Sequence, residues 1–91
     1  MQYVVCYDIS DDARRSRLAA TLLDFGARVQ ESVFVANLDS QLAAKMLDRI
    51  RRLVEPRTDG VHVFELCAAC AAKTATFGEA ELVKDERYYV I

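Results

Sequence analysis

The stretch YVVCYDISDDARRSRL, residues 3–18, decides the fold. Its apolar start predicts a strand over residues 2–7, buried on both faces at the centre of a sheet. The strand ends at Asp8, so the carboxylate of Asp8 is expected to lie at the edge of the sheet. The Ser-Asp-Asp cluster at residues 10–12 is typical of a helix start. The stretch therefore predicts a strand, an acid and a helix in direct succession.

Three arginines, Arg14, Arg15 and Arg17, lie in the opening turns of the predicted helix. The helix macrodipole disfavours positive charge at that end, so an anionic group is expected to compensate them. Asp11 and Asp12 can do so at spacings of three and four residues, and so can a bound phosphate. This segment alone favours neither interpretation.

Two amphipathic helices are predicted. The first spans residues 12–25 and ends at Gly26, expected in the left-handed conformation. The second begins at Asp39 or Ser40 and ends before Pro56, which cannot continue a helix. The inward-facing residues of the first helix are Leu18, Leu22 and Phe25. In the second helix, the apolar residues that follow helical spacing are Ala43, Met46, Leu47, Ile50, Leu53 and Val54.

The remaining segments are predicted to form strands or turns. Residues 27–38 are rich in β-branched residues but polar in the middle, which predicts a bent or bulged strand or two short ones. Residues 61–66 form a further strand after a Thr-Asp-Gly turn. Residues 74–78 form a short strand or turn. Residues 79–91 begin acidic and end in Tyr-Tyr-Val-Ile, which predicts a terminal strand pairing with this sheet or a partner's.

This order of elements predicts a single α+β domain over residues 1–91. It is the ferredoxin-like split βαβ plan (βαββαβ) with an extra C-terminal strand, and it places both helices on one face of the sheet. The other face is then free for a second copy of the chain. We therefore expect a homodimer with twofold symmetry.

The composition of the chain limits which kinds of molecule it is expected to bind. Of the 91 residues, 53% are hydrophobic, and this surplus favours an oligomer interface. The net charge of −2 and the pI of about 5.3 restrict nucleic-acid contact to a local patch. Three cysteines without a signal segment predict a reduced, cytoplasmic protein. No apolar run approaches the roughly 20 residues that span a bilayer, so we expect no membrane partner.

Asp8 is the strongest candidate for a catalytic or metal-binding residue. A carboxylate between a strand end and a helix start can bind a hard cation, and Mg²⁺ usually takes one or two protein carboxylates. Twofold symmetry would supply the second if two Asp8 side chains meet near the axis. The alternative, more common at such a spacing, is that Asp8 accepts backbone N–H bonds and caps the turn that follows.

Two arginine groups are candidates for phosphate binding, because guanidinium matches phosphate oxygens. The alternative is that these arginines are simply solvated and ion-paired, which is the usual state of arginines on a helix surface. The groups are Arg15, Arg17 and Arg28, and Arg49, Arg51, Arg52 and Arg57.

The cysteines offer a weaker motif. Cys67 and Cys70 form a C-x-x-C, which with Cys6 and His62 would make a four-ligand zinc site. A second closely spaced ligand pair is missing, however. The chain order is also unlike that of thioredoxin-type proteins. The preferred interpretation is that they are small buried side chains.

Residues 7–18 (YDISDDARRSRL) and 26–38 (GARVQESVFVANL) together resemble the CRISPR-associated Cas-two family. The shared features are an apolar strand ending in Tyr-Asp, a basic first helix and the sequence Gly-x-Arg-Val-Gln-x-Ser-Val-Phe. The sequence likeness is close over residues 3–38. The remainder of the chain resembles the family only in the order of its elements.

The resemblance implies a ferredoxin-like homodimer in which the terminal strand of each subunit completes the partner's sheet. It implies a role in spacer acquisition, where the dimer bridges two dimers of the Cas-one integrase and helps to hold DNA. For some members it implies a metal-dependent nuclease acting on RNA or duplex DNA. Asp8 inherits the roles of catalytic residue and ligand to Mg²⁺ or Mn²⁺. The other positions carried over are the arginines Arg15, Arg17 and Arg28, the packing aromatic Phe34 and the supporting Tyr7.

Our leading hypothesis is a scaffold and DNA-handling subunit, with DNA contacts through Arg49, Arg51 and Arg52 or the first-helix arginines. The alternative is a stand-alone, metal-dependent endoribonuclease such as a toxin-like interferase. A third hypothesis, a ferredoxin-like regulatory domain binding a small molecule, predicts neither metal dependence nor nucleic-acid contact.

Overall fold

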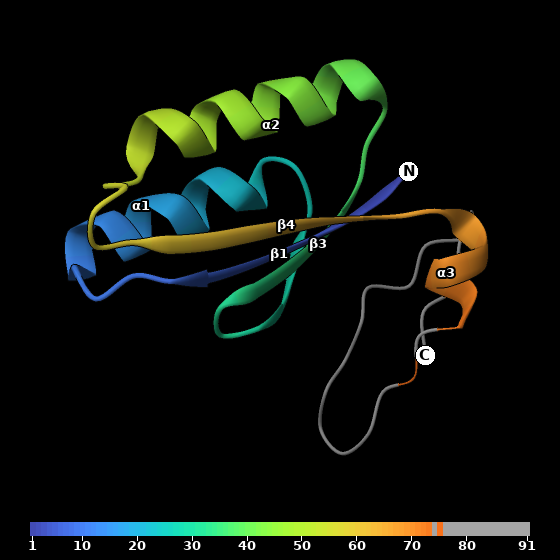
Figure 1. Ribbon diagram of the computed structural model, residues 1–91, viewed down its shortest axis with the longest axis horizontal. Coiled ribbons are helices and arrows are strands. Elements are labelled where there is room, and N and C mark those ends of the chain that lie inside the picture. Colours follow the sequence, from blue (N-terminus) through green and yellow to red (C-terminus); the bar gives the residue numbers. More distant parts are fainter. Residues whose placement is uncertain (74, 76–91) are drawn as a thin grey trace.

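The computed structural model describes residues 1–73 and 75. Four strands form one antiparallel sheet in the order β2-β3-β1-β4 (Figure 1). This is the predicted ferredoxin-like arrangement. The elements are β1 (Gln2–Asp8), α1 (Asp12–Leu23), β2 (Ala27–Gln30), β3 (Val33–Asn37), α2 (Ser40–Leu53), β4 (Gly60–Leu66) and α3 (Ala68–Ala72).

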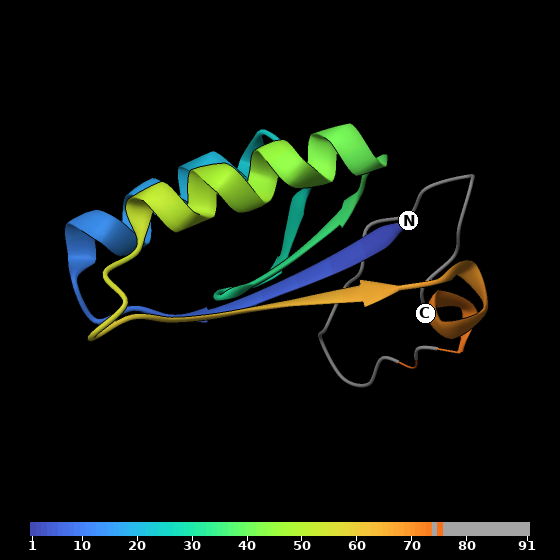
Figure 2. The same ribbon diagram turned by 45° about the horizontal axis from the view of Figure 1, so that its top comes forward.

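Both long helices, α1 and α2, cover the same face of the sheet, as predicted (Figures 1 and 2). Side chains alternate along β1, so Tyr3, Val5 and Tyr7 are buried beneath the helices. They pack with Leu18, Phe34 and other residues in one core. Phe34 is among the largest fully buried side chains, as expected of a packing aromatic.

The opposite face of the sheet, which we call the open face, is covered by neither long helix. Val4 and Cys6 of β1 are therefore only half-buried there. The prediction that β1 is buried on both faces is wrong for this single chain. Phe64 of β4 has 51% of its surface exposed and stacks on His62, with ring centroids 6.1 Å apart.

Both long helices begin at an aspartate. Asp11 accepts a hydrogen bond from the backbone N–H of Arg14, and Asp39 accepts one from Leu42, each at 2.8 Å. These bonds satisfy backbone donors that have no partner within the helix. Asp39, rather than Ser40, is thus the N-cap of α2.

Gly26 has a different role from the predicted left-handed terminator, because its φ lies outside the left-handed range. It is needed for close packing. A Cβ atom built on Gly26 would collide with the backbone oxygen of Val35 and lie 2.7 Å from the Cβ of Ala36. The backbone entering β2 therefore lies too close to β3 for any side chain.

Residues 27–38 form two short strands with a register shift between Arg28 and Gln30, so both predicted features, the division and the bulge, are present. The alanine-rich segment after β4 forms the short helix α3. The predicted elements at 74–78 and 79–91 lie outside the described residues, apart from residue 75. Among the described residues, no helix is long and apolar enough to cross a bilayer.

Candidate functional site

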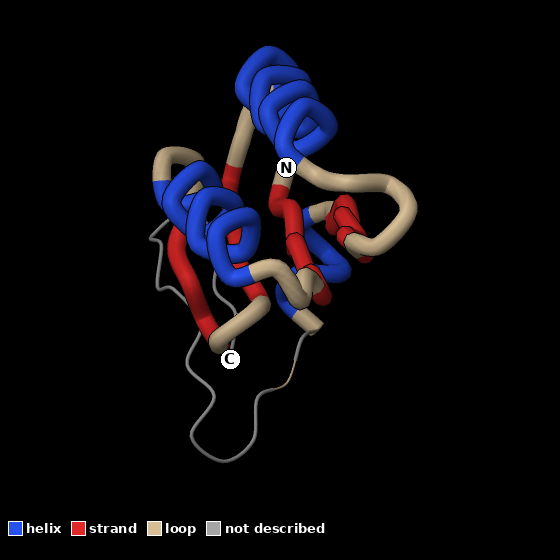
Figure 3. The backbone as a smooth tube through the Cα atoms, turned by 90° about the vertical axis from the view of Figure 1, so that its left-hand side faces the viewer, coloured by secondary structure: helices blue, strands red, loops and turns tan. Residues whose placement is uncertain are grey.

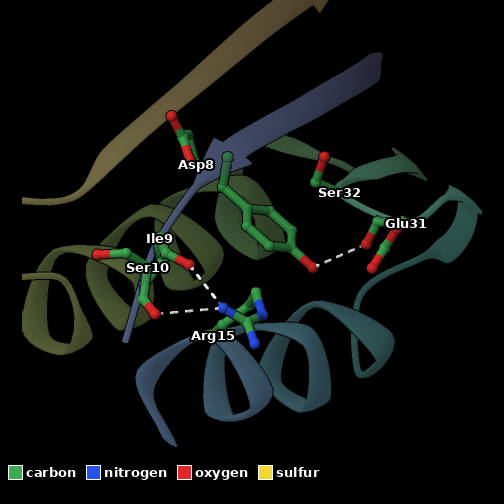
Figure 4. A pocket seen from close by; sticks show the side chains of 7 residues that line it. Asp8, Ile9, Ser10, Arg15, Glu31 and Ser32 are labelled. Carbon is green, nitrogen blue, oxygen red and sulfur yellow. Dashed lines mark hydrogen bonds between the residues drawn. The ribbon is translucent and has the colours of Figure 1, made fainter. Parts of the chain in front are cut away.

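Asp8 is the last residue of β1, and its side chain is exposed. Since strand side chains alternate, Asp8 projects opposite to the buried Tyr7, and Figure 4 shows it across the strand from Arg15. Within residues 1–73 and 75, the structure records no hydrogen bond or ion pair to the Asp8 carboxylate. The predicted turn cap is therefore not formed by Asp8; Asp11 caps the helix instead.

A hollow of about 360 Å³ lies beside the end of β1. The hydroxyl of Tyr7 donates to the backbone oxygen of Glu31 at 3.2 Å, and its ring stacks on Phe34 with centroids 6.1 Å apart. These contacts join the end of β1, next to Asp8, to the β2–β3 turn and to β3. The hollow is lined by Tyr7, Asp8, Ile9, Ser10, Arg15, Glu31 and Ser32 (Figure 4).

Arg15 reaches this hollow but is engaged within the chain. Its guanidinium donates to the backbone oxygens of Ile9 at 3.0 Å and Ser10 at 3.4 Å, and it forms an ion pair with Asp12. These bonds hold the loop from β1 to α1. For Arg15, the structure favours the interpretation that a nearby acid compensates its charge.

Arg14 has a partner that is distant in sequence. Its Nε and Nη2 donate to the two carboxylate oxygens of Asp59 at 2.8 and 3.2 Å. Asp59 has a fully buried side chain and also accepts from the backbone N–H of Glu55. The hydrogen bond from Arg14 holds the pKa of Asp59 below its ordinary value. This pair joins the first turn of α1 to the α2–β4 loop. Figure 3 views the molecule from the end where α1 begins and α2 ends.

A second hollow, of about 320 Å³, lies between the two long helices. Arg17 and Thr21 of α1 line one side, and Arg49, Arg52 and Leu53 of α2 line the other. We call it the arginine hollow. It gathers three guanidinium groups that the sequence had divided between two candidate patches.

The arginines of the arginine hollow differ in how they are paired. Arg49 pairs with Asp24 at 2.9 Å and lies over the ring of Phe25, and Arg52 pairs with Asp48 at 3.1 Å. For Arg17, the structure records no ion pair within residues 1–73 and 75.

The other predicted arginines lie apart from the arginine hollow. Arg28, on β2, has its guanidinium 5.3 Å from the ring centroid of Phe34. Arg51 lines neither hollow and pairs with Asp48 at 4.0 Å. The two predicted groups are Arg15, Arg17 and Arg28, and Arg49, Arg51, Arg52 and Arg57. The fold divides them differently, because the arginine hollow brings Arg17 of the first group beside Arg49 and Arg52 of the second.

The described residues contain no complete metal site within one chain. Across residues 1–73 and 75, no three or more His, Cys, Asp or Glu side chains are placed to hold a metal ion. Asp8 contributes one exposed carboxylate, and Mg²⁺ usually takes one or two carboxylates from a protein and keeps several waters. In the described part of the chain, Cys6, His62, Cys67 and Cys70 are therefore not brought together as a four-ligand set.

Cys67 and Cys70 are exposed, so the interpretation that they are small buried side chains is wrong. They lie beyond the end of β4, outside the core that the two long helices enclose. Cysteine is usually a small buried side chain, but the sequence does not reveal that this segment continues past the end of the sheet.

Comparison with known proteins identifies the family. The family model for CRISPR associated protein Cas2 matches residues 1–74. The chain belongs to the Cas2 family. It is 38% identical over 77 residues to "CRISPR-associated endoribonuclease Cas2 4" of Rhodospirillum rubrum, covering 85% of this chain and 62% of that protein.

Two further relatives cover nearly the whole chain. The chain is 32% identical over 88 residues to "CRISPR-associated endoribonuclease Cas2 3" of Chloroflexus aurantiacus, covering 97% and 95% of the two chains. A solved structure, "hypothetical protein TT1823 from Thermus thermophilus", superposes with a TM-score of 0.80 at 36% identity, covering 89% and 94%. These likenesses confirm the family and fold predicted from the sequence.

Proposed function

We propose that this Cas2-family chain is the homodimeric scaffold of a spacer-acquisition complex, which bridges dimers of the Cas-one integrase and contacts DNA. Family membership supports the assembly and its partner. The observation that carries the DNA contact is the arginine hollow, where two helices bring three guanidinium groups together in a chain of net charge −2. A local basic patch is what an acidic chain needs to bind phosphate.

The open face supports the proposed homodimer. Val4, Cys6 and Val33 are half-buried there, and Phe64 has 51% of its surface exposed. An apolar sheet face without a helix layer gains free energy when a second copy covers it. Because α1 and α2 lie on the opposite face, this dimer would leave both arginine hollows accessible to DNA.

Removing charge from the arginine hollow tests the DNA contact. The double variant Arg17→Gln/Arg52→Gln spares Arg49, which pairs with Asp24 and contacts Phe25. Each neutralised phosphate releases condensed counterions, so the slope of log Kobs against log salt should become shallower by about 0.9 for each phosphate that the variant no longer neutralises. The measurement is fluorescence anisotropy of a labelled duplex at several salt concentrations.

The matched control is Lys45→Gln/Lys73→Gln, which removes two positive charges from exposed residues outside the hollow. It should leave the slope within about 0.3 of the wild-type value. If both double variants change the slope equally, only net charge matters and the arginine hollow is not the DNA site. Binding by the wild type that does not respond to salt would also contradict the proposal.

A second activity, Mg²⁺-dependent endonuclease action on RNA or DNA, is favoured by the position of Asp8. Its carboxylate is exposed, projects on the open-face side and has no recorded partner within the described chain. Two such carboxylates in a twofold dimer would match the one or two that Mg²⁺ commonly takes. The bound ion would supply charge stabilisation at a phosphodiester. Asp8 would hold the ion, and Tyr7 would position the strand end that carries Asp8.

A further inference from the structure

Two thiols lie together just beyond β4, where neither proposed activity uses them. Cys67 follows the last residue of the strand, and Cys70 lies within α3. Both side chains are exposed, whereas Cys6, the remaining cysteine, is partly covered within the sheet. Their three-residue separation across one helical turn is compatible with the Cα separation of a disulfide, about 4.4–6.8 Å.

The contacts between Cys67 and Cys70 are asymmetric. The backbone N–H of Cys70 donates to Sγ of Cys67 at 3.4 Å. Hydrogen bonds from Cys70 lower the pKa of the Cys67 thiol, whereas hydrogen bonding and charge from Cys67 raise the pKa of Cys70. Since the thiolate is the nucleophile, Cys67 is the better suited of the two thiols to attack a disulfide, and Cys70 is suited to resolve the mixed disulfide that results.

We propose that Cys67 and Cys70 form a redox-active dithiol that reduces small, accessible disulfides and closes an intramolecular disulfide. This inference rests on the geometry of the C-x-x-C and is independent of the proposed scaffold and nuclease functions. The exposed position suits a low-molecular-weight substrate such as oxidised glutathione. It also replaces the interpretation of these residues as passive core side chains.

The exchange takes two steps. The Cys67 thiolate attacks one sulfur of the substrate disulfide, forming a mixed disulfide and releasing one thiolate, which takes up a proton. Cys70 then loses its proton and attacks Sγ of Cys67, closing the Cys67–Cys70 bond and releasing the second thiolate. In total, the dithiol loses two electrons and two protons, and the substrate disulfide becomes two thiols.

The test uses the full-length protein, oxidised glutathione and alkylation. After incubation, free thiols are blocked with iodoacetamide and the protein is digested with trypsin. Fragment 58–73 carries both Cys67 and Cys70, and fragment 1–14 carries Cys6. We expect fragment 58–73 to lose both alkylation sites without gaining glutathione, and to recover them after dithiothreitol. Fragment 1–14 should remain alkylated.

Single variants separate the roles of the two thiols. Cys70→Ser should accumulate a stable glutathione adduct on Cys67, because the second step is blocked. Cys67→Ser should form adducts more slowly, and Cys6→Ser should behave as the wild type. The proposal is overturned if both wild-type thiols stay alkylatable, if the wild type retains a glutathione adduct, or if a zinc chelator abolishes the protection.

Discussion

Asp8→Asn is expected to lower Mg²⁺-dependent cleavage of RNA or DNA by at least about a hundredfold. Substituting groups that only support a metal ligand costs roughly 10–100-fold in affinity or activity, so removing the ligand's own charge should cost at least as much. The variant keeps the shape of the side chain. Because Asp8 is exposed and has no recorded partner among the described residues, the fold should be unaffected.

Glu31→Gln is the matched control. Glu31 is also exposed and lines the same hollow, but it extends from the β2–β3 turn rather than from the end of β1. It should keep wild-type cleavage and wild-type Mg²⁺ binding by isothermal titration calorimetry, whereas Asp8→Asn should lose both. If Asp8→Asn binds and cleaves like the wild type, Asp8 is not the metal ligand.

Gly26→Ala is expected to lower the free energy of unfolding by about 3 kcal/mol, at the upper end for overpacked sites. The new Cβ would collide with the backbone oxygen of Val35 and lie 2.7 Å from the Cβ of Ala36. Neither is the tip of a flexible side chain, so relief requires β2 and β3 to move apart. Urea denaturation followed by circular dichroism measures the change in stability.

Gly60→Ala is a suitable comparison, because it adds the same methyl group at the start of β4. The nearest atom to that Cβ would be the backbone oxygen of Asp8, at an ordinary contact distance of 3.9 Å. Its effect should stay below about 1 kcal/mol. Equal destabilisation by both substitutions would mean that the close approach at Gly26 is not what requires glycine there.

Much of the fold follows from local sequence. Asp11 and Asp39 mark helix starts because capping depends only on residues a few positions away. Asp8 stands out because the end of an apolar run is visible in the sequence. The sequence also marks Gly26 as special but for the wrong reason, since close packing of β2 against β3 is not visible in a local pattern.

The arrangement of charges depends on tertiary packing and is harder to predict. Arg17 lies with Arg49 and Arg52 only because α1 and α2 pack side by side. The Arg14–Asp59 pair joins residues 45 positions apart, and the sequence pattern indicates Asp59 only as part of a turn. Local spacing predicts the Arg15–Asp12 contact but cannot predict pairs of this kind.

The proposed scaffold role is tested most directly by light scattering of this chain mixed with its Cas-one integrase and a short duplex. The scaffold account predicts one complex in which a dimer of this chain joins two integrase dimers, formed equally by the wild type and Asp8→Asn. The account is contradicted if the components stay separate while the wild type alone cleaves nucleic acid with Mg²⁺. That result would make the chain a stand-alone nuclease.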